Sequence, residues 1–217
     1  KYYQIYINQG LKDHRVFSNY GIILQSLGKL NEAENSLQKA VEIKPNFVQA
    51  HYNLGIILKD LGKLKEAENY CIKASKMRPE SFDIQINLSS ILKDIGKIKQ
   101  AELSIRKAIE IKPNNSKAYC NLGYILIDLN KLEEAELFTR KAIEIEPEFI
   151  DPHFNLALIL LRSKKFLEGW DQYEWRWKII RNFKVKNKLN TSKPEWKRDM
   201  KQRVLLWPEQ GIGDQIL

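Results

Sequence analysis

Residues 48–81, VQAHYNLGIILKDLGKLKEAENYCIKASKMRPES, are one unit of a pattern that recurs along the chain every 34 residues. The period is clearest in a proline near the end of each unit, at Pro45, Pro79, Pro113 and Pro147. Alanines precede the prolines at two constant distances, as Ala33, Ala67, Ala101 and Ala135, and as Ala40, Ala74, Ala108 and Ala142. A fixed period of this length is typical of a solenoid built from helical hairpins, which presents an extended surface for binding.

Each unit begins with the pattern of an amphipathic helix. We number the positions of a unit from 1, which falls at His14, Val48, Phe82, Ser116 and Ile150. Large residues recur at positions 4, 7 and 11 and a small residue at position 8, so these positions form one stripe along a helix. The small residue lets a second helix approach closely.

A second helix is predicted after a turn at position 15, which is Gly28, Gly62, Gly96 and Asn130. Glycine accepts the left-handed conformation of a helix C-cap, and asparagine is its usual substitute. The second helix carries alanine at positions 20 and 27 and a larger residue at position 24, and the proline at position 32 ends the unit. In the fifth unit we expect Asp151 and Pro152 to open the first helix as N-cap and first-turn proline.

The same register divides the chain into segments. We expect residues 1–13 to be the second helix of a truncated earlier unit, followed by complete units at 14–47, 48–81, 82–115 and 116–149. Residues 150–180 form an atypical unit without the proline, with an aromatic second helix over 166–178, as expected of a unit that caps a stack. We expect a basic linker at 181–203 and the first strand and turn of a truncated α/β domain at 204–217.

The repeated pattern resembles the tetratricopeptide repeat family, and the resemblance extends over residues 1 to about 180. It implies an all-α protein, a right-handed superhelix of antiparallel helix pairs in which the first helix of each pair lines the concave face. It also implies a module that binds a protein or an extended peptide.

Position 6 is asparagine in all five units: Asn19, Asn53, Asn87, Asn121 and Asn155. Position 13 lies nearly two helical turns further along the same face and is aspartate in the middle units, as Asp60, Asp94 and Asp128. An asparagine amide can pair with both the N–H and the C=O of an extended backbone. Apolar groups on this face, at Tyr52, Ile86 and Tyr124, complete a predicted peptide-binding groove. The competing interpretation is that the asparagines were inherited by duplication and are merely solvated.

Several other classes of site are disfavoured. The chain has no apolar run of about 18 residues and no cluster of Cys and His with the spacing of a zinc site. His51 and His153 fall at the core position 4, where packing is the expected role, and no metal or cofactor is predicted. Cys71 and Cys120 occupy different positions of the unit, and unpaired thiols favour a reducing, cytoplasmic compartment. The net charge of +9 is scattered and lacks an RNA-binding signature, which disfavours nucleic acid as a partner.

The end of the chain carries a second resemblance, in residues 169–177, in Pro194 and Trp196, and in 209–214 (EQGIGD). These resemble bacterial proteins in which tetratricopeptide repeats precede a GT-B glycosyltransferase domain similar to heptosyltransferases and to the O-linked N-acetylglucosamine transferase. The resemblance implies a nucleotide-sugar cofactor bound beyond residue 217, and it makes Asp214 a weak candidate for a catalytic base; the competing interpretation is that Asp214 only caps a helix.

Three functions therefore remain open from the sequence. The first is a scaffold that binds peptides and has no catalytic residue of its own in this segment. The second is the region of a glycosyltransferase that recruits the acceptor, and the third is a structural or oligomerisation arm.

Overall fold

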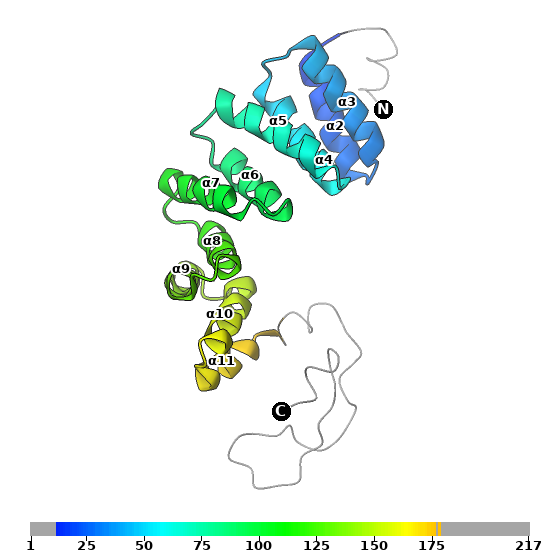
Figure 1. Ribbon diagram of the computed structural model, residues 1–217. Helices are drawn as coiled ribbons and strands as arrows, with labels where there is room; N and C mark the ends of the chain where they lie inside the picture. Colours follow the sequence, from blue (N-terminus) through cyan, green and yellow to red (C-terminus); the bar gives the residue numbers. More distant parts are fainter. Residues whose placement is uncertain (1–11, 177, 179–217) are drawn as a thin grey trace, which may run out of the picture.

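The computed structural model describes residues 12–176 and residue 178. In this part the chain forms ten α-helices and no β-strand. The helices are α2 (His14–Ser26), α3 (Leu30–Ile43), α4 (Val48–Asp60), α5 (Leu64–Met77), α6 (Phe82–Asp94), α7 (Ile98–Ile111), α8 (Ser116–Asp128), α9 (Leu132–Ile145), α10 (Ile150–Arg162) and α11 (Phe166–Tyr173). They follow one another in pairs along one elongated stack, from α2 and α3 at one end to α10 and α11 at the other (Figure 1).

The helices form two layers. Each second helix packs against the first helix of its own pair, and α3, α5, α7 and α9 also pack against the first helix of the next pair. The first helices also contact one another from pair to pair, so α2, α4, α6, α8 and α10 make a continuous inner layer, the layer that the sequence predicts to be concave. The predicted all-α superhelical repeat fold is confirmed.

The turn inside each pair is closed by a residue in the left-handed conformation. Gly28, Gly62 and Gly96 have φ of 74°, 75° and 90°, and Asn130 has φ of 57°. In the first pair the N–H of Lys29 donates to the C=O of Leu24 at 2.9 Å, which satisfies a carbonyl that the helix end would leave unpaired. Lys164, the residue at this position in the last pair, also adopts φ of 60°, so the fold imposes the conformation even on a side chain that does not favour it.

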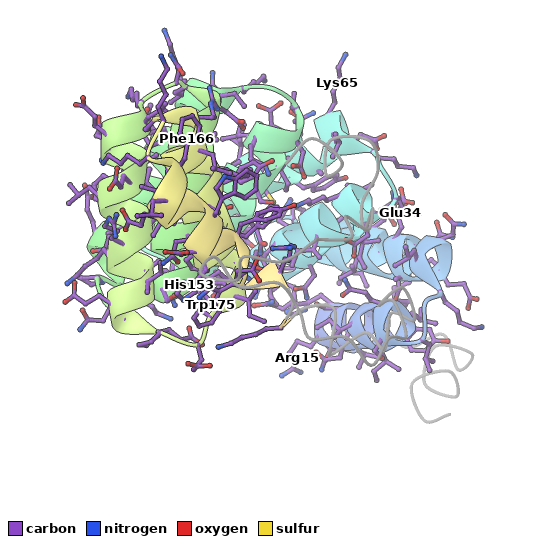
Figure 2. The ribbon with its side chains drawn as sticks, turned by 90° about the horizontal axis from the view of Figure 1, so that it is seen from below. Arg15, Glu34, Lys65, His153, Phe166 and Trp175 are labelled. Carbon is purple, nitrogen blue, oxygen red and sulfur yellow. The ribbon has the colours of Figure 1, made fainter. Side chains whose placement is uncertain are left out.

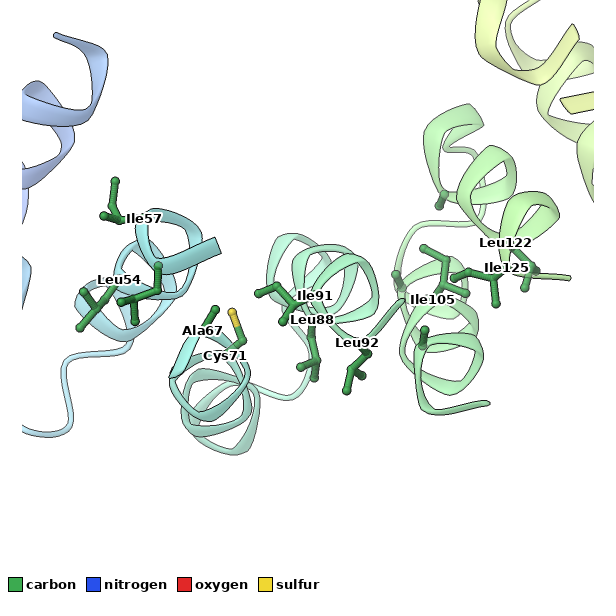
Figure 3. Packing of buried hydrophobic residues seen from close by; sticks show 14 of the residues in the cluster. Leu54, Ile57, Ala67, Cys71, Leu88, Ile91, Leu92, Ile105, Leu122 and Ile125 are labelled. Atoms are coloured by element: carbon green, nitrogen blue, oxygen red, sulfur yellow. The ribbon is translucent and has the colours of Figure 1, made fainter. Parts of the chain in front are cut away.

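The small residue at position 8 is where the two helices of a pair approach most closely. A Cβ added at Gly123 would collide with the hydroxyl of Thr139, and one added at Gly55 would collide with the thiol of Cys71. Between pairs, the isoleucine at position 10 is fully or almost fully buried in α4, α6, α8 and α10. Figure 3 shows this packing around Ile57, Cys71, Ile91 and Ile125: side chains of the core occupy the spaces between successive helices.

Two expectations about the fifth unit are wrong. The helix α10 begins at Ile150 with Phe149 as its N-cap, and Phe149 makes no side-chain capping bond. Asp151 therefore lies inside the first turn and is not the N-cap, whereas Pro152 lies in the first turn as predicted. A carboxylate remains favourable there because the partial positive charge of a helix N-terminus extends over the first turn.

The second correction concerns the other end of this unit. The helix α11 ends at Tyr173, residues 174 and 175 form a turn, and residues 176 and 178 are helical again, whereas the sequence predicted one uninterrupted helix over 166–178. The turn places Trp175 on His153, with ring centroids 3.5 Å apart and the ring planes 4° from parallel (Figure 2). Stacking on the first helix of the pair accounts for the early end.

Some expectations fall on residues outside the described ranges. They are most of the truncated first unit, the basic linker at 181–203, the strand and turn at 204–217, and Asp214. These remain predictions from the sequence.

A row of ion pairs links neighbouring pairs on the outer side. The lysine at position 16 of one unit contacts the glutamate at position 21 of the unit before it, in the pairs Lys63–Glu34, Lys97–Glu68, Lys131–Glu102 and Lys165–Glu136. Their nitrogen–oxygen distances are 2.6 to 3.0 Å. Position 21 of the last unit is Trp170, so the row of glutamates ends there.

These ion pairs predict a dependence of stability on pH. Burial alone would raise the pKa of Glu102, but hydrogen bonds from Arg106 and Lys131 outweigh it and hold that pKa below its usual range. Burial would likewise raise the pKa of Glu136. Hydrogen bonds from Lys165 and Arg140 outweigh this effect and lower that pKa. A carboxyl group whose pKa is lower in the folded chain stabilises the fold above its unfolded pKa, and this contribution is lost as the pH falls through the folded pKa.

We therefore expect the free energy of unfolding, measured by urea denaturation, to decrease as the pH is lowered from about 5 to about 3. The double variant Glu102→Gln and Glu136→Gln should show a shallower decrease over this interval. Glu110→Gln is the matched control, because Glu110 is exposed and forms no ion pair in the described part of the chain. Equal slopes in the double variant and the wild type would contradict the assignment.

Candidate functional site

The predicted asparagine row lies on the concave layer, but its members differ in how accessible they are. Asn19 is exposed, Asn87 and Asn121 are half-buried, and Asn53 and Asn155 are buried.

Asparagines along this row donate hydrogen bonds backward, to position 5 of the preceding unit. The Nδ2 of Asn87 donates to the hydroxyl of Tyr52 at 2.7 Å. The Nδ2 of Asn155 lies 3.4 Å from the C=O of Cys120 and 3.3 Å from its Sγ. These two amides therefore fasten one first helix to the next, and part of their hydrogen-bonding capacity is used inside the protein.

Asn53 is engaged along its own helix, because its Oδ1 accepts from the Nε2 of Gln49 at 2.9 Å. Its Nδ2 is buried without a partner in the described part of the chain. The residue at position 5 of the preceding unit is Ser18, whose buried hydroxyl also has no partner among these residues.

Asn121 differs from Asn87 and Asn155. Position 5 of the preceding unit is Ile86, which has no side-chain acceptor, and among the described residues the amide of Asn121 makes no hydrogen bond. The side chain is half-buried and lines a pocket instead. Asn121, the fourth rung of the row, is therefore half-buried with an amide that is open to a ligand.

Two carboxylates of the predicted aspartate row already have partners within the protein, and these partners were not among the predicted site residues. Asp60 accepts from the Nε2 of Gln25 at 3.1 Å. Asp94 lies 3.1 Å from the Nζ of Lys59 and 3.9 Å from the Nζ of Lys93. Asp128 is exposed and forms no ion pair with another described residue.

A pocket of about 290 Å³ lies on this face, formed by α6, α8 and α10. Of the predicted residues, Asn121, Asn155 and Tyr124 line it. It is also lined by Ser89, Ser90, Lys93, Cys120, Ile125, Asp151 and Phe154. The other predicted residues, namely Asn19, Asn53, Asn87, Asp60, Asp94, Asp128, Tyr52 and Ile86, do not line it.

Two charged residues of this pocket, Lys93 and Asp151, were not among the predicted site residues. Lys93 is at position 12, and its Nζ lies 4.2 Å from the centre of the Tyr124 ring, so the ammonium group sits over the aromatic wall. The available signal was the register itself: positions 5, 6, 9 and 12 of consecutive first helices share one face.

The surroundings of the two cysteines and of His51 and His153 fit a role in packing. Burial raises the pKa of Cys71 and of Cys120 to about 12, so neither thiol is ionised near neutral pH. The Nε2 atoms of His51 and His153 lie 2.7 and 2.8 Å from the C=O of Pro45 and Pro147. A ring nitrogen at position 4 therefore satisfies the carbonyl of the proline that ends the preceding unit.

In residues 12–176 and 178 no three His, Cys, Asp or Glu side chains come close enough to hold a metal ion. None of the helices in the same ranges is both long enough and apolar enough to cross a membrane.

Comparison with models of protein families identifies tetratricopeptide repeats in this chain. A family described as TPR repeat matches residues 21–62, and families described as tetratricopeptide repeat match residues 48–81, 82–115 and 105–136. No curated protein matches the chain.

Solved structures share the fold at low sequence identity. MamA from Desulfovibrio magneticus RS-1 is 22% identical with a TM-score of 0.70, and the match covers 81% of this chain and 97% of that one. YrrB, described as a TPR protein with an unusual peptide-binding site, is 21% identical with a TM-score of 0.69, covering 84% and 94%. PilF from Pseudomonas aeruginosa is 19% identical with a TM-score of 0.67, covering 75% and 74%. The chain therefore carries tetratricopeptide repeats, stacked in an all-α superhelix.

Proposed function

We propose that this chain is a scaffold that binds a protein, through an extended peptide segment, on the concave face of its repeats. Tetratricopeptide repeats typically mediate contacts between proteins, and YrrB, which shares the fold, is described as having a peptide-binding site. The observation that carries the proposal is the open rung of the asparagine row, Asn121, in a pocket walled by Tyr124 and Phe154.

The chemistry of this face suits a peptide backbone. The amide of Asn121 offers two donors and one acceptor. Asn87 retains a second N–H and its Oδ1 after its Nδ2 has donated to Tyr52. Each hydrogen bond exchanged between such an amide and a peptide contributes about 0.5–1.5 kcal/mol net. The exposed carboxylate of Asp128 can accept hydrogen bonds from the same segment.

The test begins with an unbiased library of displayed 12-residue peptides, about 40 Å long when extended, which is enough to cross several units. A selected peptide is synthesised and its Kd is measured by fluorescence anisotropy. The double variant Asn87→Ala and Asn121→Ala should weaken binding by about 1–3 kcal/mol, which is the sum of two such contributions. The melting temperature should confirm that the variant folds.

The matched control is the double variant Asn35→Ala and Asn69→Ala. These asparagines are exposed on the second helices, at the same position of two consecutive units. We expect the control to bind like the wild type. If the concave variant also binds like the wild type, or if no peptide is selected, the proposal fails and a structural or oligomerisation arm becomes the better account.

A second proposed function is the recruitment of an acceptor by a glycosyltransferase to which these repeats belong. It rests on the resemblance of residues 209–214 to the first turn of a GT-B domain, and these residues lie outside the described ranges. Under this proposal the selected peptide, fused to candidate acceptors, should raise transfer from a nucleotide sugar by the whole protein. Transfer that is insensitive to the fusion would contradict it.

A further inference from the structure

The pocket between α6, α8 and α10 has an apolar wall on one side and an unused amide on the other. Tyr124, Ile125 and Phe154 form the wall, and Tyr124 is 41% exposed although aromatic side chains are usually covered. A pocket of about 290 Å³ is much larger than the roughly 30 Å³ of one water in the liquid, so it can admit a large side chain.

Its position in the row makes this pocket different from the equivalent places on the stack. Asn87 and Asn155 hold the preceding helix through Tyr52 and Cys120, so their amides are partly occupied. Asn121 has Ile86 in the corresponding place and keeps its full capacity. An extended peptide that crosses the first helices can therefore place a backbone amide on Asn121 and the neighbouring side chain against the wall.

The charges around the pocket are unequal on its two sides. On the side of α4 and α6, the ammonium groups of Lys59 and Lys93 share one carboxylate, Asp94, which leaves one positive charge uncompensated. Lys59 is also held by the hydroxyl of Ser90 at 2.5 Å, so Lys93 is the one that turns toward the pocket. On the α10 side, Asp151 is exposed and has no ion pair among the described residues.

We propose that this pocket is the specificity subsite of the peptide groove, and that it takes a large apolar side chain of an acidic segment. The apolar side chain packs on Tyr124, Ile125 and Phe154, Asn121 holds the adjacent backbone, and an acidic side chain of the ligand pairs with Lys93. The proposal rests on the proposed peptide-binding function and names the class of peptide that this face selects.

The probes are three pools of synthetic 12-residue peptides with a fixed central pair, Phe–Glu, Phe–Lys or Ala–Glu, in otherwise identical random flanks. Burying a phenylalanine side chain releases more transfer free energy than burying an alanine side chain. The Phe–Glu pool should therefore bind at least about tenfold more tightly than the Ala–Glu pool. A partly exposed ion pair contributes less, so a preference of about two- to fivefold over the Phe–Lys pool is expected.

The variant Lys93→Glu reverses the charge at the pocket and should reverse the preference between the Phe–Glu and Phe–Lys pools. Its fold is checked by circular dichroism, and Lys93→Gln, which should abolish the preference without reversing it, serves as a second, milder variant. Among single alanine variants, Asn121→Ala should weaken the Phe–Glu pool by about two- to tenfold, whereas Asn19→Ala, an exposed rung outside the pocket, should not.

The outcomes separate this inference from the function on which it rests. If no pool binds and no library peptide is selected, the peptide-binding function itself fails. If peptides bind, but the Ala–Glu pool equals the Phe–Glu pool, or Lys93→Glu leaves the preference unchanged, the subsite assignment is wrong while the function stands. Preferential binding of the Phe–Lys pool by the wild type would show that Asp151, not Lys93, sets the charge preference.

Discussion

Replacing Leu126 by alanine should lower the free energy of unfolding by about 2–5 kcal/mol. Leu126 stands at position 11 of α8 and is fully buried in the core cluster. The loss combines the transfer free energy of the removed methyl groups with the cavity that a repeat stack cannot readily close, because helices on both sides hold it open. Urea denaturation followed by circular dichroism measures the effect.

Leu103→Ala is the matched control for this prediction. Leu103 is also a helical leucine, in α7, but it is 70% exposed, so its truncation should change the stability by no more than about 0.5 kcal/mol. If the two variants were equally stable, the assignment of position 11 to the core between successive units would be wrong.

The second large effect is expected from Gly123→Leu, which should destabilise the protein by about 1–3 kcal/mol. Leucine is the better helix former, so a neutral site would show stabilisation by up to about 1 kcal/mol. At Gly123, however, even the first added carbon meets the hydroxyl and the Cβ of Thr139 on the facing helix α9. The two helices must therefore separate, and the pair loses packing along its length.

A double-mutant cycle isolates this contact. Thr139→Ala removes the hydroxyl, so Gly123→Leu should cost less in that background than in the wild type, and the two changes should not be additive. Additive free energies of unfolding, or a stabilised Gly123→Leu variant, would contradict the close approach of α8 and α9.

The fold was predictable because its determinants are local and repeat every 34 residues. The start of each first helix, the left-handed turn at position 15 and the close approach of the two helices at position 8 can each be predicted from the type of residue at that position. The conformation of Lys164 shows how strong the register is, since the turn persists without glycine or asparagine. The end of α11 was not predictable in the same way, because it depends on Trp175 stacking on His153 in another helix.

The site was predictable only in outline. The asparagine row follows from the register, but the availability of each amide depends on the residue 35 positions earlier, as in the contact of Asn87 with Tyr52. The sequence contains both residues, yet only the packing of successive first helices shows that they meet. The same reasoning applies to Lys93, whose proposed role rests on its place over Tyr124 and beside Asp94.

The most direct test of the account is a heteronuclear NMR titration of the protein with a library-selected peptide, following the side-chain amide signals of asparagine. The account predicts that the Asn121 amide shifts most and that the amides of Asn35 and Asn69, on the second helices, do not move. Shifts confined to the second helices, or an unperturbed Asn121 amide in a saturated complex, would contradict binding on the concave face.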